Sequence, residues 1–250
     1  MTTGSASGPG MRAILLAAGR GRRLGKDHPK CLLEIEGKTL LERHLENMPR
    51  AGIDRLTIVV GYLKEQIEDK LAKIAAPLPI ELIENPLFVH GSIVSLQVAG
   101  ERLLEGAIWM DADVLYPPAL LKRLVDSKQK NCVLLDKRSE ESGEEMMVGI
   151  KDGRAAKIAR RVGDGWDFRG ETVGFTKVDR EGGAAMKQAL DAEIAAGRLD
   201  QEYEAALDQS FSHVPFGYET VDDLAWTEID FEADVEKASR LARGARELTG

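Results

Sequence analysis

A cationic segment follows the first apolar run of the chain, and its residue types could bind phosphate. It reads LAAGRGRRLGKDHPK from Leu16 to Lys30 and sets five basic side chains against the single acid Asp27. The basic residues are Arg20, Arg22, Arg23, Lys26 and Lys30. Glycines at 19 and 21 let main-chain N–H groups approach an anion, and arginine forks and lysine ammonium groups neutralise phosphate oxygens. The segment therefore predicts a phosphate-binding loop, in which Arg20 and Arg22 are equally well read as solvent-facing charges.

Two familiar phosphate loops do not fit this segment. A Walker loop needs glycine at position 24 followed by Lys and Ser or Thr, but position 24 is Leu24 and Lys26 precedes Asp27. A dinucleotide fingerprint also requires glycine or alanine at position 24, and an acid after the second strand, where Val60-Gly61 stand. The loop is therefore of another kind. A merely solvated basic loop would leave its glycine and arginine spacing unexplained.

Paired acids further along the chain offer hard oxygen ligands. Asp111 and Asp113 end a predicted strand, where an open parallel sheet exposes its ligand crevice. Carboxylates in that place suit Mg²⁺, which keeps coordination positions for phosphate oxygens and water. The alternative is that both are solvated or helix-capping aspartates. Asp111 is the weaker metal candidate, because the strand pleat turns alternate residues in different directions.

The pattern LAAGxGxRL followed by PK resembles the signature of the sugar-phosphate nucleotidyltransferase family, the MobA-like NTP transferases. The matching residues are Leu16, Ala17, Ala18, Gly19, Gly21, Arg23, Leu24, Pro29 and Lys30. The resemblance implies that residues 16–19, Gly21 and Arg23 bind the nucleotide. It further implies that Arg23 holds the β- and γ-phosphates and that Lys30 bridges the α-phosphate and the acceptor, so that both are catalytic.

The resemblance extends to the acids. Asp113 matches the family's metal aspartate, and the segment WTEID, from Trp226 to Asp230, resembles the one that returns a second metal aspartate to the site. The implied cofactor is Mg²⁺ on Asp113 and Asp230, with Asp111 beside the nucleotide. Glu228 is then a neighbouring ligand or hydrogen-bond acceptor, and Asp234 caps the closing helix.

Two further segments resemble substrate-binding parts of cytidylyl-transferring members. Asn85 and the run that begins Gly91-Ser92 resemble the lining of the base and ribose, although a helix N-cap explains Ser92 equally well. Choline enzymes supply aromatic and acidic groups for a cationic head from the region that corresponds to residues 137–220. Its counterparts here are Trp166, Glu171, Glu202 and Tyr203, with a core role as the alternative for Trp166 and Tyr203.

Within the family, the chain resembles choline-phosphate and related small-molecule cytidylyltransferases in its short length, its Asp-Ala-Asp motif and its WTEID segment. The implied reaction transfers CMP from CTP to a small phosphorylated alcohol or phosphonate, of the phosphocholine or 2-aminoethylphosphonate type, and releases pyrophosphate by in-line attack. The alternatives are a sugar-1-phosphate nucleotidyltransferase using UTP, GTP or CTP, and a non-catalytic nucleotide-binding module. We expect structural or exposed roles for His28, His44, His90 and His213, because none has triad spacing to a nucleophilic serine.

Alternating strand and helix patterns must position these residues. Strands are predicted at 13–18, 56–60, 80–83, 107–110 and 132–135, and helices at 39–52, 63–74, 92–104 and 118–125. This rhythm predicts an α/β fold with a Rossmann-like, mostly parallel central sheet and helices on both faces. Beyond Asp136, antiparallel strands are expected at 147–150, 155–158 and 172–178, helices at 183–196, 202–208 and 234–246, and a strand at 213–216. We expect residues 1–11 to be a disordered leader, and 12–250 to be one nucleotidyltransferase domain with a small antiparallel lid or acceptor-binding insertion at about 137–220.

Composition excludes several classes of protein. The 250 residues carry 42 acidic and 34 basic side chains, a formal charge of -8, which argues against nucleic-acid partners and anionic membrane surfaces. The apolar runs are shorter than the roughly 20 residues of a membrane span. Cys31 and Cys132 lie far apart, without a second Cys or His at metal spacing, so a reducing cytoplasm is expected. The oligomeric state, a homo-oligomer included, stays open.

Overall fold

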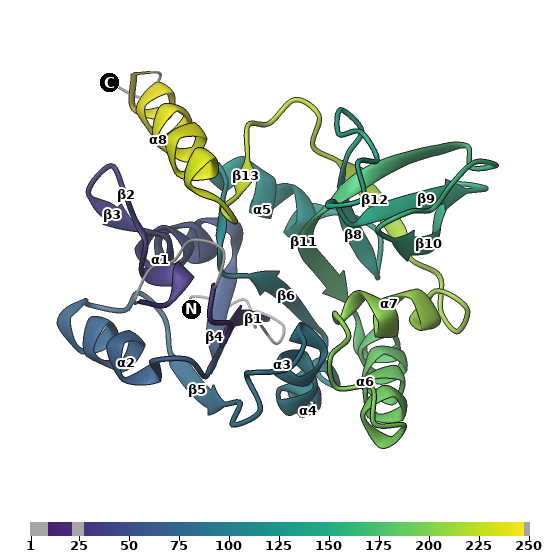
Figure 1. The fold of residues 1–250 in the computed structure, drawn as a ribbon, viewed down its shortest axis with the longest axis horizontal. Coiled ribbons are helices and arrows are strands. Elements are labelled where there is room, and N and C mark those ends of the chain that lie inside the picture. The colour runs from purple at the N-terminus through teal and green to yellow at the C-terminus, as the bar shows by residue number, and fades with distance from the viewer. Residues whose placement is uncertain (1–9, 22–27, 248–250) are drawn as a thin grey trace, which may run out of the picture.

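The computed structural model describes residues 10–21 and 28–247 of the chain (Figure 1). Strands and helices alternate through the first half, as the periodicity predicts. The elements of this half are β1 (Met11–Ala17), a 3₁₀ turn (Lys30–Leu32), β2 (Glu34–Ile35), β3 (Lys38–Thr39), α1 (Leu40–Ala51), β4 (Ile53–Val60), α2 (Lys64–Lys73), β5 (Ile80–Glu84), α3 (Ser92–Val98), α4 (Gly100–Leu103), β6 (Ala107–Asp111), β7 (Val114–Leu115), α5 (Pro118–Asp126) and β8 (Cys132–Asp136).

The second half contributes antiparallel strands and the helices α6, α7 and α8. Its elements are β9 (Met147–Lys151), β10 (Arg154–Ala159), β11 (Phe168–Val178), α6 (Arg180–Ala195), α7 (Glu204–Ser210), β12 (Gly217–Thr220), β13 (Thr227–Glu228) and α8 (Glu232–Glu247). No helix among the described residues is long and apolar enough to cross a membrane.

The central sheet has nine strands and runs β10-β9-β11-β6-β1-β4-β5, with β8 paired to β11 and β12 paired to β8. β1 is parallel to β4 and β6, β4 is parallel to β5, and β12 is parallel to β8. β11 is antiparallel to β6, β8 and β9. The predicted mostly parallel sheet is confirmed, and the expected antiparallel part extends this same sheet.

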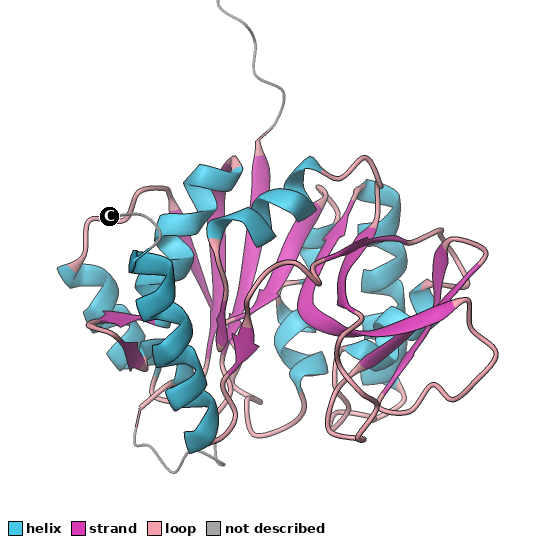
Figure 2. Cartoon of the chain, turned by 90° about the horizontal axis from the view of Figure 1, so that it is seen from above, coloured by secondary structure: helices cyan, strands magenta, loops and turns pink. Residues whose placement is uncertain are grey.

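Helices cover both faces of the sheet (Figure 2). Successive side chains of a strand point to opposite faces, and in β1 both faces are apolar: Ala13 and Leu15 pack with α1, α2 and α5, whereas Ile14 packs with α3, α4, α6 and α7. Continuous apolar runs are typical of strands buried on both sides. This arrangement leaves the carboxyl ends of β1 and β6 side by side for a ligand site.

Helix α1 shows how the sequence fixes an element locally. The Thr39 hydroxyl accepts a hydrogen bond from the Glu42 N–H, and the Glu42 carboxylate accepts one from the Thr39 N–H at 2.8 Å, which together form a capping box. Gly52 ends the helix in the left-handed region at φ 94°. Both boundaries are those predicted from the sequence. The helix therefore presents a fixed buried face to the sheet.

The hairpin of β9 and β10 lies at one end of the sheet. Asp152 and Gly153 both have positive φ, 49° and 72°, as a two-residue turn that matches strand twist requires. The hairpin continues into β11, the long strand that joins it to β6. Figure 1 shows these strands on the side of the molecule opposite α1 and α2.

Several predicted boundaries are wrong: β11 begins at Phe168 instead of residue 172, α6 begins at Arg180 instead of residue 183, and three further differences follow. The strand expected at 213–216 is β12 at Gly217–Thr220, because pairing with Cys132–Leu135 of β8 sets its register, while the buried side chains of Val214 and Phe216 fill the core. The helix expected at 92–104 is two helices, separated at Ala99 (φ -93°, ψ 4°). Met11, expected in the leader, begins β1; the leader residues 1–9 lie outside the described residues.

Candidate active site

Lys30 bridges the two acids that the sequence singles out as metal ligands. Its Nζ donates to Asp113 Oδ2 at 2.8 Å and also to Asp230 Oδ1. The Lys30 side chain is 17% exposed. Burial alone would lower the pKa of this ammonium, but the charges of Asp113 and Asp230 outweigh burial and raise it. The structure thus brings the predicted catalytic residue Lys30 together with both predicted metal ligands, in a group we call the Lys30 corner.

The topology explains why these distant residues meet. Lys30 begins the 3₁₀ turn that follows the loop after β1, and Asp113 follows the neighbouring strand β6. The short strands β7 and β13 pair antiparallel, with Val114 opposite Glu228, and the Ile229 N–H donates to the Asp113 carbonyl at 3.1 Å. This two-stranded ladder sets Asp230 beside Asp113 and fixes the second acid in the site.

Asp113, Glu228 and Asp230 form a group that could hold a metal ion, since one carboxylate oxygen of each lies within 4.8 Å of the others. Burial, followed by repulsion from Asp113 and Asp230, raises the pKa of Glu228 to about 8. Crowded carboxylate oxygens of this kind are relieved by a hard divalent cation and suit Mg²⁺. The donor set therefore fits the implied cofactor, with Glu228 as a third ligand.

A cavity of about 960 Å³ extends from the Lys30 corner between the two halves of the chain. A smaller one of about 130 Å³ adjoins it and is lined by Gly19, Gly21, Lys30 and Asp113, among others. Of the predicted nucleotide-binding residues, Leu16, Ala18, Gly19, Gly91, Ser92 and Asp111 line the larger cavity, and Leu16, Ala17, Gly19 and Gly21 line the smaller. The glycine loop and the acids thus share one site. Arg23 lies outside the described residues.

Two predicted base-binding residues have different surroundings. Asn85 is fully buried behind the cavity wall, where it donates to Ser95 Oγ at 3.0 Å and accepts from the Leu87 N–H at 2.9 Å. Ser92 is not the N-cap of α3, because Gly91 holds that position. The Ser92 hydroxyl instead donates to Glu202 at 2.7 Å and accepts from the Tyr203 N–H at 2.9 Å. It ties the nucleotide side of the cavity to the opposite side.

Asp111 is held by residues from the second half of the chain. The Tyr203 hydroxyl donates to its carboxylate at 2.8 Å, and the Tyr203 ring packs edge-on against Trp109 with 6.2 Å between centroids. Gly174, at φ 78°, stands where a Cβ would overlap the Asp111 carboxylate. Burial, then repulsion from Asp113 and Glu204, raises the Asp111 pKa. A glycine inside a strand pattern is the signal that could have revealed this close approach.

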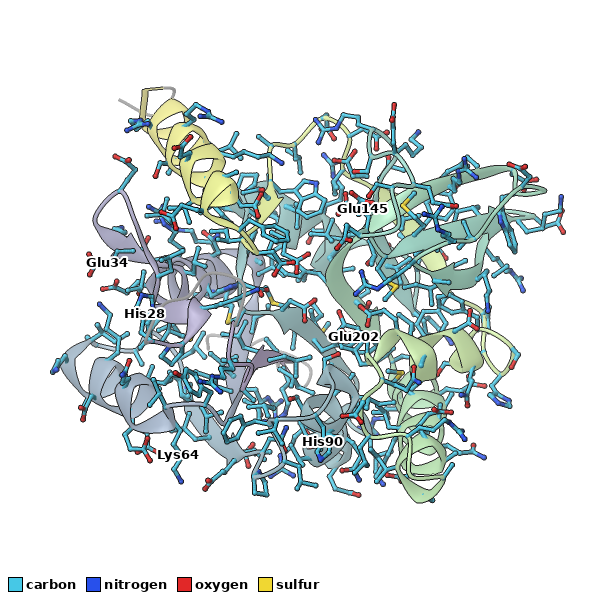
Figure 3. All side chains as sticks on the ribbon, in the orientation of Figure 1. His28, Glu34, Lys64, His90, Glu145 and Glu202 are labelled. Atoms are coloured by element: carbon cyan, nitrogen blue, oxygen red, sulfur yellow. The ribbon has the colours of Figure 1, made fainter. Side chains whose placement is uncertain are left out.

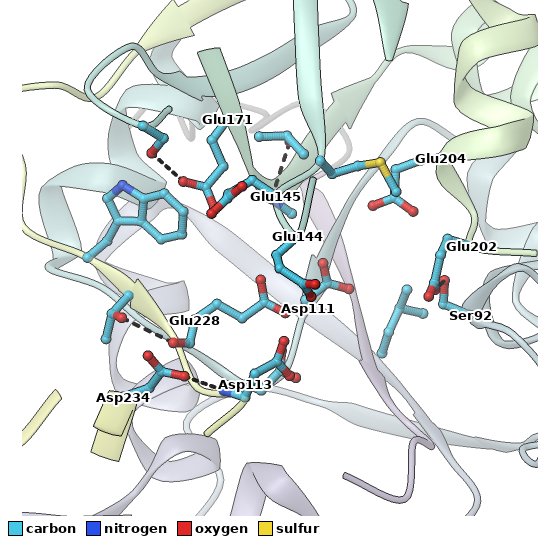
Figure 4. A pocket seen from close by; sticks show the side chains of 18 of the residues that line it. Ser92, Asp111, Asp113, Glu144, Glu145, Glu171, Glu202, Glu204, Glu228 and Asp234 are labelled. Atoms are coloured by element: carbon cyan, nitrogen blue, oxygen red, sulfur yellow. Dashed lines mark hydrogen bonds between the residues drawn. The ribbon is translucent and has the colours of Figure 1, made fainter. Parts of the chain in front are cut away.

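The far side of the cavity is rich in glutamates, which we call the acidic wall: Glu144, Glu145, Glu171, Glu202 and Glu204. Their side chains converge on one open space (Figure 4), and Figure 3 shows Glu145 and Glu202 on the half of the molecule away from His28 and Glu34. Burial raises the pKa of Glu204 to about 7. Burial and then repulsion from Glu145 and Asp136 raise that of Glu171.

The structure brings three of the four predicted acceptor residues to the cavity: Glu171, Glu202 and Tyr203. Trp166 is not among the lining residues. Its indole covers Gly149, where a Cβ would overlap the ring, and its Nε1 donates to the Val162 carbonyl at 3.1 Å. Sequence reasoning missed Glu144, Glu145 and Glu204, which carry no motif. Asp234 accepts from the main-chain N–H groups of residues 230 and 231, which confirms its structural role as a cap.

Known proteins resemble the chain in sequence and in fold. It is 30% identical over 127 residues to CMP-5′-(3-aminopropyl)phosphonate synthase of Streptomyces rubellomurinus, covering 49% of this chain and 20% of the relative. It is 29% identical over 138 residues to CTP:phosphoglutamine cytidylyltransferase of Campylobacter jejuni, covering 51% of this chain and 53% of the relative. The chain therefore spans from a fifth to about half of the length of these relatives.

A solved structure shares the fold over nearly the whole chain. CTP:phosphocholine cytidylyltransferase from Streptococcus pneumoniae superposes with a TM-score of 0.77 at 21% identity, covering 94% of this chain and 100% of that one. The family description "MobA-like NTP transferase domain" matches residues 13–178, which include the glycine loop, Lys30 and Asp113. The chain belongs to the family of MobA-like NTP transferase domains.

Proposed function

We propose that this chain transfers CMP from CTP to a small phosphorylated or phosphonate acceptor that carries an ammonium group, and releases pyrophosphate. The observation that carries the proposal is the Lys30 ammonium, held between Asp113 and Asp230 beside the glycine loop and at one end of a large cavity. A fixed positive charge at this place would offset the repulsion between two phosphate-bearing reactants.

The reaction needs no strong base. An acceptor phosphate already carries about -1.5 to -2 charges at neutral pH. One of its oxygens attacks the α-phosphorus of CTP in line, the new phosphorus–oxygen bond forms, and the bond from the α-phosphorus to the oxygen bridging it to the β-phosphate breaks. Pyrophosphate leaves with that oxygen. Lys30 positions both phosphates and offsets their repulsion, and holding the reactants in line lowers the entropic barrier.

Asp113 and Asp230, with Glu228 beside them, would hold Mg²⁺. The ion would supply neutralisation of the charge on the α-phosphate. The crowded carboxylates support this assignment, because like charges within 4.8 Å need a counter-charge. Asp113 and Asp230 would hold the ion, and Lys30 would contact phosphate oxygens of CTP and the acceptor.

The acidic wall supports an acceptor with a positive charge. Two arginines lie beside it: Arg138 makes a bidentate pair with Asp136, and Arg160 donates to the Glu144 carbonyl and lies 3.9 Å from Glu202, so it compensates one glutamate of the wall directly. Raised pKa values at Glu171 and Glu204 mark carboxylates whose charges are poorly compensated by the protein. An ammonium group on the acceptor would compensate these charges, because it attracts the carboxylates. The aminopropylphosphonate and phosphocholine of the relatives' names have this chemistry.

The test is acceptor-dependent release of pyrophosphate. CTP, UTP and GTP would each be incubated with Mg²⁺ and, separately, with 2-aminoethylphosphonate, 3-aminopropylphosphonate, phosphocholine, glycerol phosphate and glucose 1-phosphate. We expect release with CTP and an amine-bearing acceptor. Release only with UTP or GTP and a sugar phosphate would instead make the chain a sugar nucleotidyltransferase, and binding of CTP without release under any condition would make it a nucleotide-binding module. Reactions with chelator in place of Mg²⁺ provide the background.

A further inference from the structure

Two polar residues on the buried face of α1 contact the segment that carries Asp113. His44 is fully buried and lies one turn from Asn47, which is also buried. His44 Nε2 lies 3.3 Å from the Ala112 carbonyl, and Asn47 donates to the Tyr116 carbonyl at 3.4 Å. Burying polar side chains costs free energy unless they are hydrogen-bonded, and these two bond main-chain carbonyls on either side of Asp113.

The surroundings of His44 fix which ring nitrogen carries the proton. Burial lowers the pKa of this imidazole to about 4, so the ring is neutral near pH 7 and holds one proton. A carbonyl can only accept, so the proton is on Nε2 and is donated to Ala112. Nδ1 then accepts from the Tyr116 hydroxyl, which is 3.2 Å away. That hydroxyl stays protonated, because burial raises the Tyr116 pKa.

Ala112 is the residue between the two acids of the Asp-Ala-Asp turn. The other side of the turn is fixed by the Ile229 N–H, which donates to the Asp113 carbonyl. The peptide units on either side of Asp113 are therefore bonded in different directions, one to α1 and one to the strand that leads to Asp230. These two hydrogen bonds fix the main chain around Asp113 and so restrict the direction of its side chain.

We propose that His44 is a positioning residue for the Asp-Ala-Asp turn, which it holds through Nε2–H to Ala112 so that Asp113 faces Asp230 and the metal. The role rests on the proposed function, but it also makes a claim about metal binding that can be measured without turnover. His44 lines neither of the two cavities described above, and its bond toward the acids is the one to Ala112.

A matched pair of variants separates positioning from packing. In His44→Gln the amide nitrogen reaches the place of Nε2 and can donate to Ala112, whereas in His44→Asn the amide reaches only the place of Nδ1, beside Tyr116. Both variants keep a buried amide, so thermal unfolding reports whether each is folded. Mn²⁺ binding to each protein alone, followed by electron paramagnetic resonance, and kcat and KM for CTP are then compared.

We expect His44→Asn to bind Mn²⁺ about 10- to 100-fold more weakly, the range found for groups that orient metal ligands, and to lose kcat similarly with little change in KM for CTP. His44→Gln should stay close to the wild type in both. Equal Mn²⁺ affinity in the two variants, or no Mn²⁺ binding by the wild type, would overturn the proposal. A wild type that binds Mn²⁺ but releases no pyrophosphate defeats the proposed function alone.

A second measurement needs no variant. Nitrogen-15 chemical shifts of the histidine rings in the folded wild-type protein distinguish the two neutral tautomers. We expect one histidine with its proton on Nε2 that stays neutral at pH 6, and this signal should be absent from His44→Gln. A His44 ring with the proton on Nδ1 cannot donate to Ala112 and would refute the positioning role, even if the Asn variant failed to fold.

Discussion

The two ends of the cavity solve opposite electrostatic problems. In the Lys30 corner the ammonium is paired with Asp113 and Asp230 within the protein, so part of their negative charge is compensated by the chain itself. In the acidic wall, glutamates face one another, and the pKa of Glu204 rises to about 7. The contrast teaches that the corner supplies a counter-charge to its own acids, whereas the wall holds carboxylates, Glu171 and Glu204, whose neutral form is favoured by burial.

The difference follows from the elements that build each end. The corner lies at the carboxyl ends of adjacent parallel strands, β1 and β6, and is closed by the short ladder of β7 and β13. The wall is assembled from the segment before β9, from β11 and from the start of α7, all in the second half of the chain. The corner thus rests on short turns at strand ends, whereas most glutamates of the wall stand in or beside connecting segments.

Removing the charge of the corner should have the largest effect. Lys30→Met keeps the aliphatic stem and deletes the ammonium, and we expect kcat for pyrophosphate release to fall about 10²- to 10³-fold, the cost of losing a preorganised group at developing charge. Circular dichroism would establish that the variant is folded. Near-normal turnover would mean that Lys30 forms an ordinary salt bridge with the two acids and has no part in the reaction.

The metal assignment is tested by a pair of acids from the same segment. We expect Asp230→Asn to raise the Mg²⁺ concentration needed for half-maximal rate at least about tenfold, since even groups that only orient a ligand cost 10- to 100-fold. Asp234→Asn is the control, because asparagine also accepts from main-chain N–H groups and preserves the cap. Equal Mg²⁺ requirements in both variants would remove Asp230 from the metal site.

Most of the fold could be predicted because its central strands, such as β6 and β8, are buried on both faces and α1 has clear end signals. Thr39 and Gly52 bound α1 as the sequence indicates. Two-residue strands such as β2, β3, β7 and β13 have no periodicity to detect, so they were missed. The strand near 213–216 was misplaced because its register depends on β8, a partner distant in the sequence.

The corner was predictable, and the wall was only partly so. Lys30, Asp113 and Asp230 belong to short motifs whose residue types speak for phosphate and metal binding. Glu144, Glu145 and Glu204 stand in charge-rich segments that look like any solvated surface, and only folding directs them inward. At Asp111, Gly174 within β11 is a local sequence signal of close approach, whereas the hydrogen bond from the Tyr203 hydroxyl is a tertiary contact without one.

Neutralising one carboxylate of the wall should weaken acceptor binding. We expect Glu171→Gln to raise the KM for an amine-bearing acceptor about tenfold, equivalent to about 1.4 kcal/mol and near the low end for a hydrogen bond to a charged group. KM for CTP should change little. Glu181→Gln, an exposed carboxylate of α6, is the matched control. A parallel rise in KM for CTP would place Glu171 at the nucleotide end.

Burial of a carboxylate in the wall should also appear as pH-dependent stability. Glu204 has a pKa of about 7 when folded and about 4.5 ordinarily, so between these values the folded state retains a proton that the unfolded state loses. Stability conferred by the protonated group is complete below about pH 4.5 and declines as the pH rises to about 7.

In Glu204→Gln this decline disappears. We expect the variant to exceed the wild type in unfolding free energy by ~1–3 kcal/mol at pH 8, given about 1.4 kcal/mol for each pKa unit, and to match it near pH 4. Urea unfolding at a series of pH values measures the difference. Curves for the two proteins that stay parallel across this range would show that Glu204 is well compensated, and the wall would then resemble the corner.

The smallest effect is expected at the edge of the wall. Trp166→Phe removes the Nε1–H that donates to the Val162 carbonyl while keeping an aromatic ring over Gly149. Because Trp166 supports the β9 strand from outside the cavity, we expect KM for the acceptor to stay within about twofold of the wild-type value. A twofold change corresponds to less free energy than the ~1 kcal/mol that a typical neutral hydrogen bond contributes to stability. Titration of the acceptor, with quaternary and primary ammonium head groups compared, measures it. A tenfold rise confined to the quaternary head group would mean that the indole turns into the cavity and that an aromatic face, together with the glutamates, completes the wall.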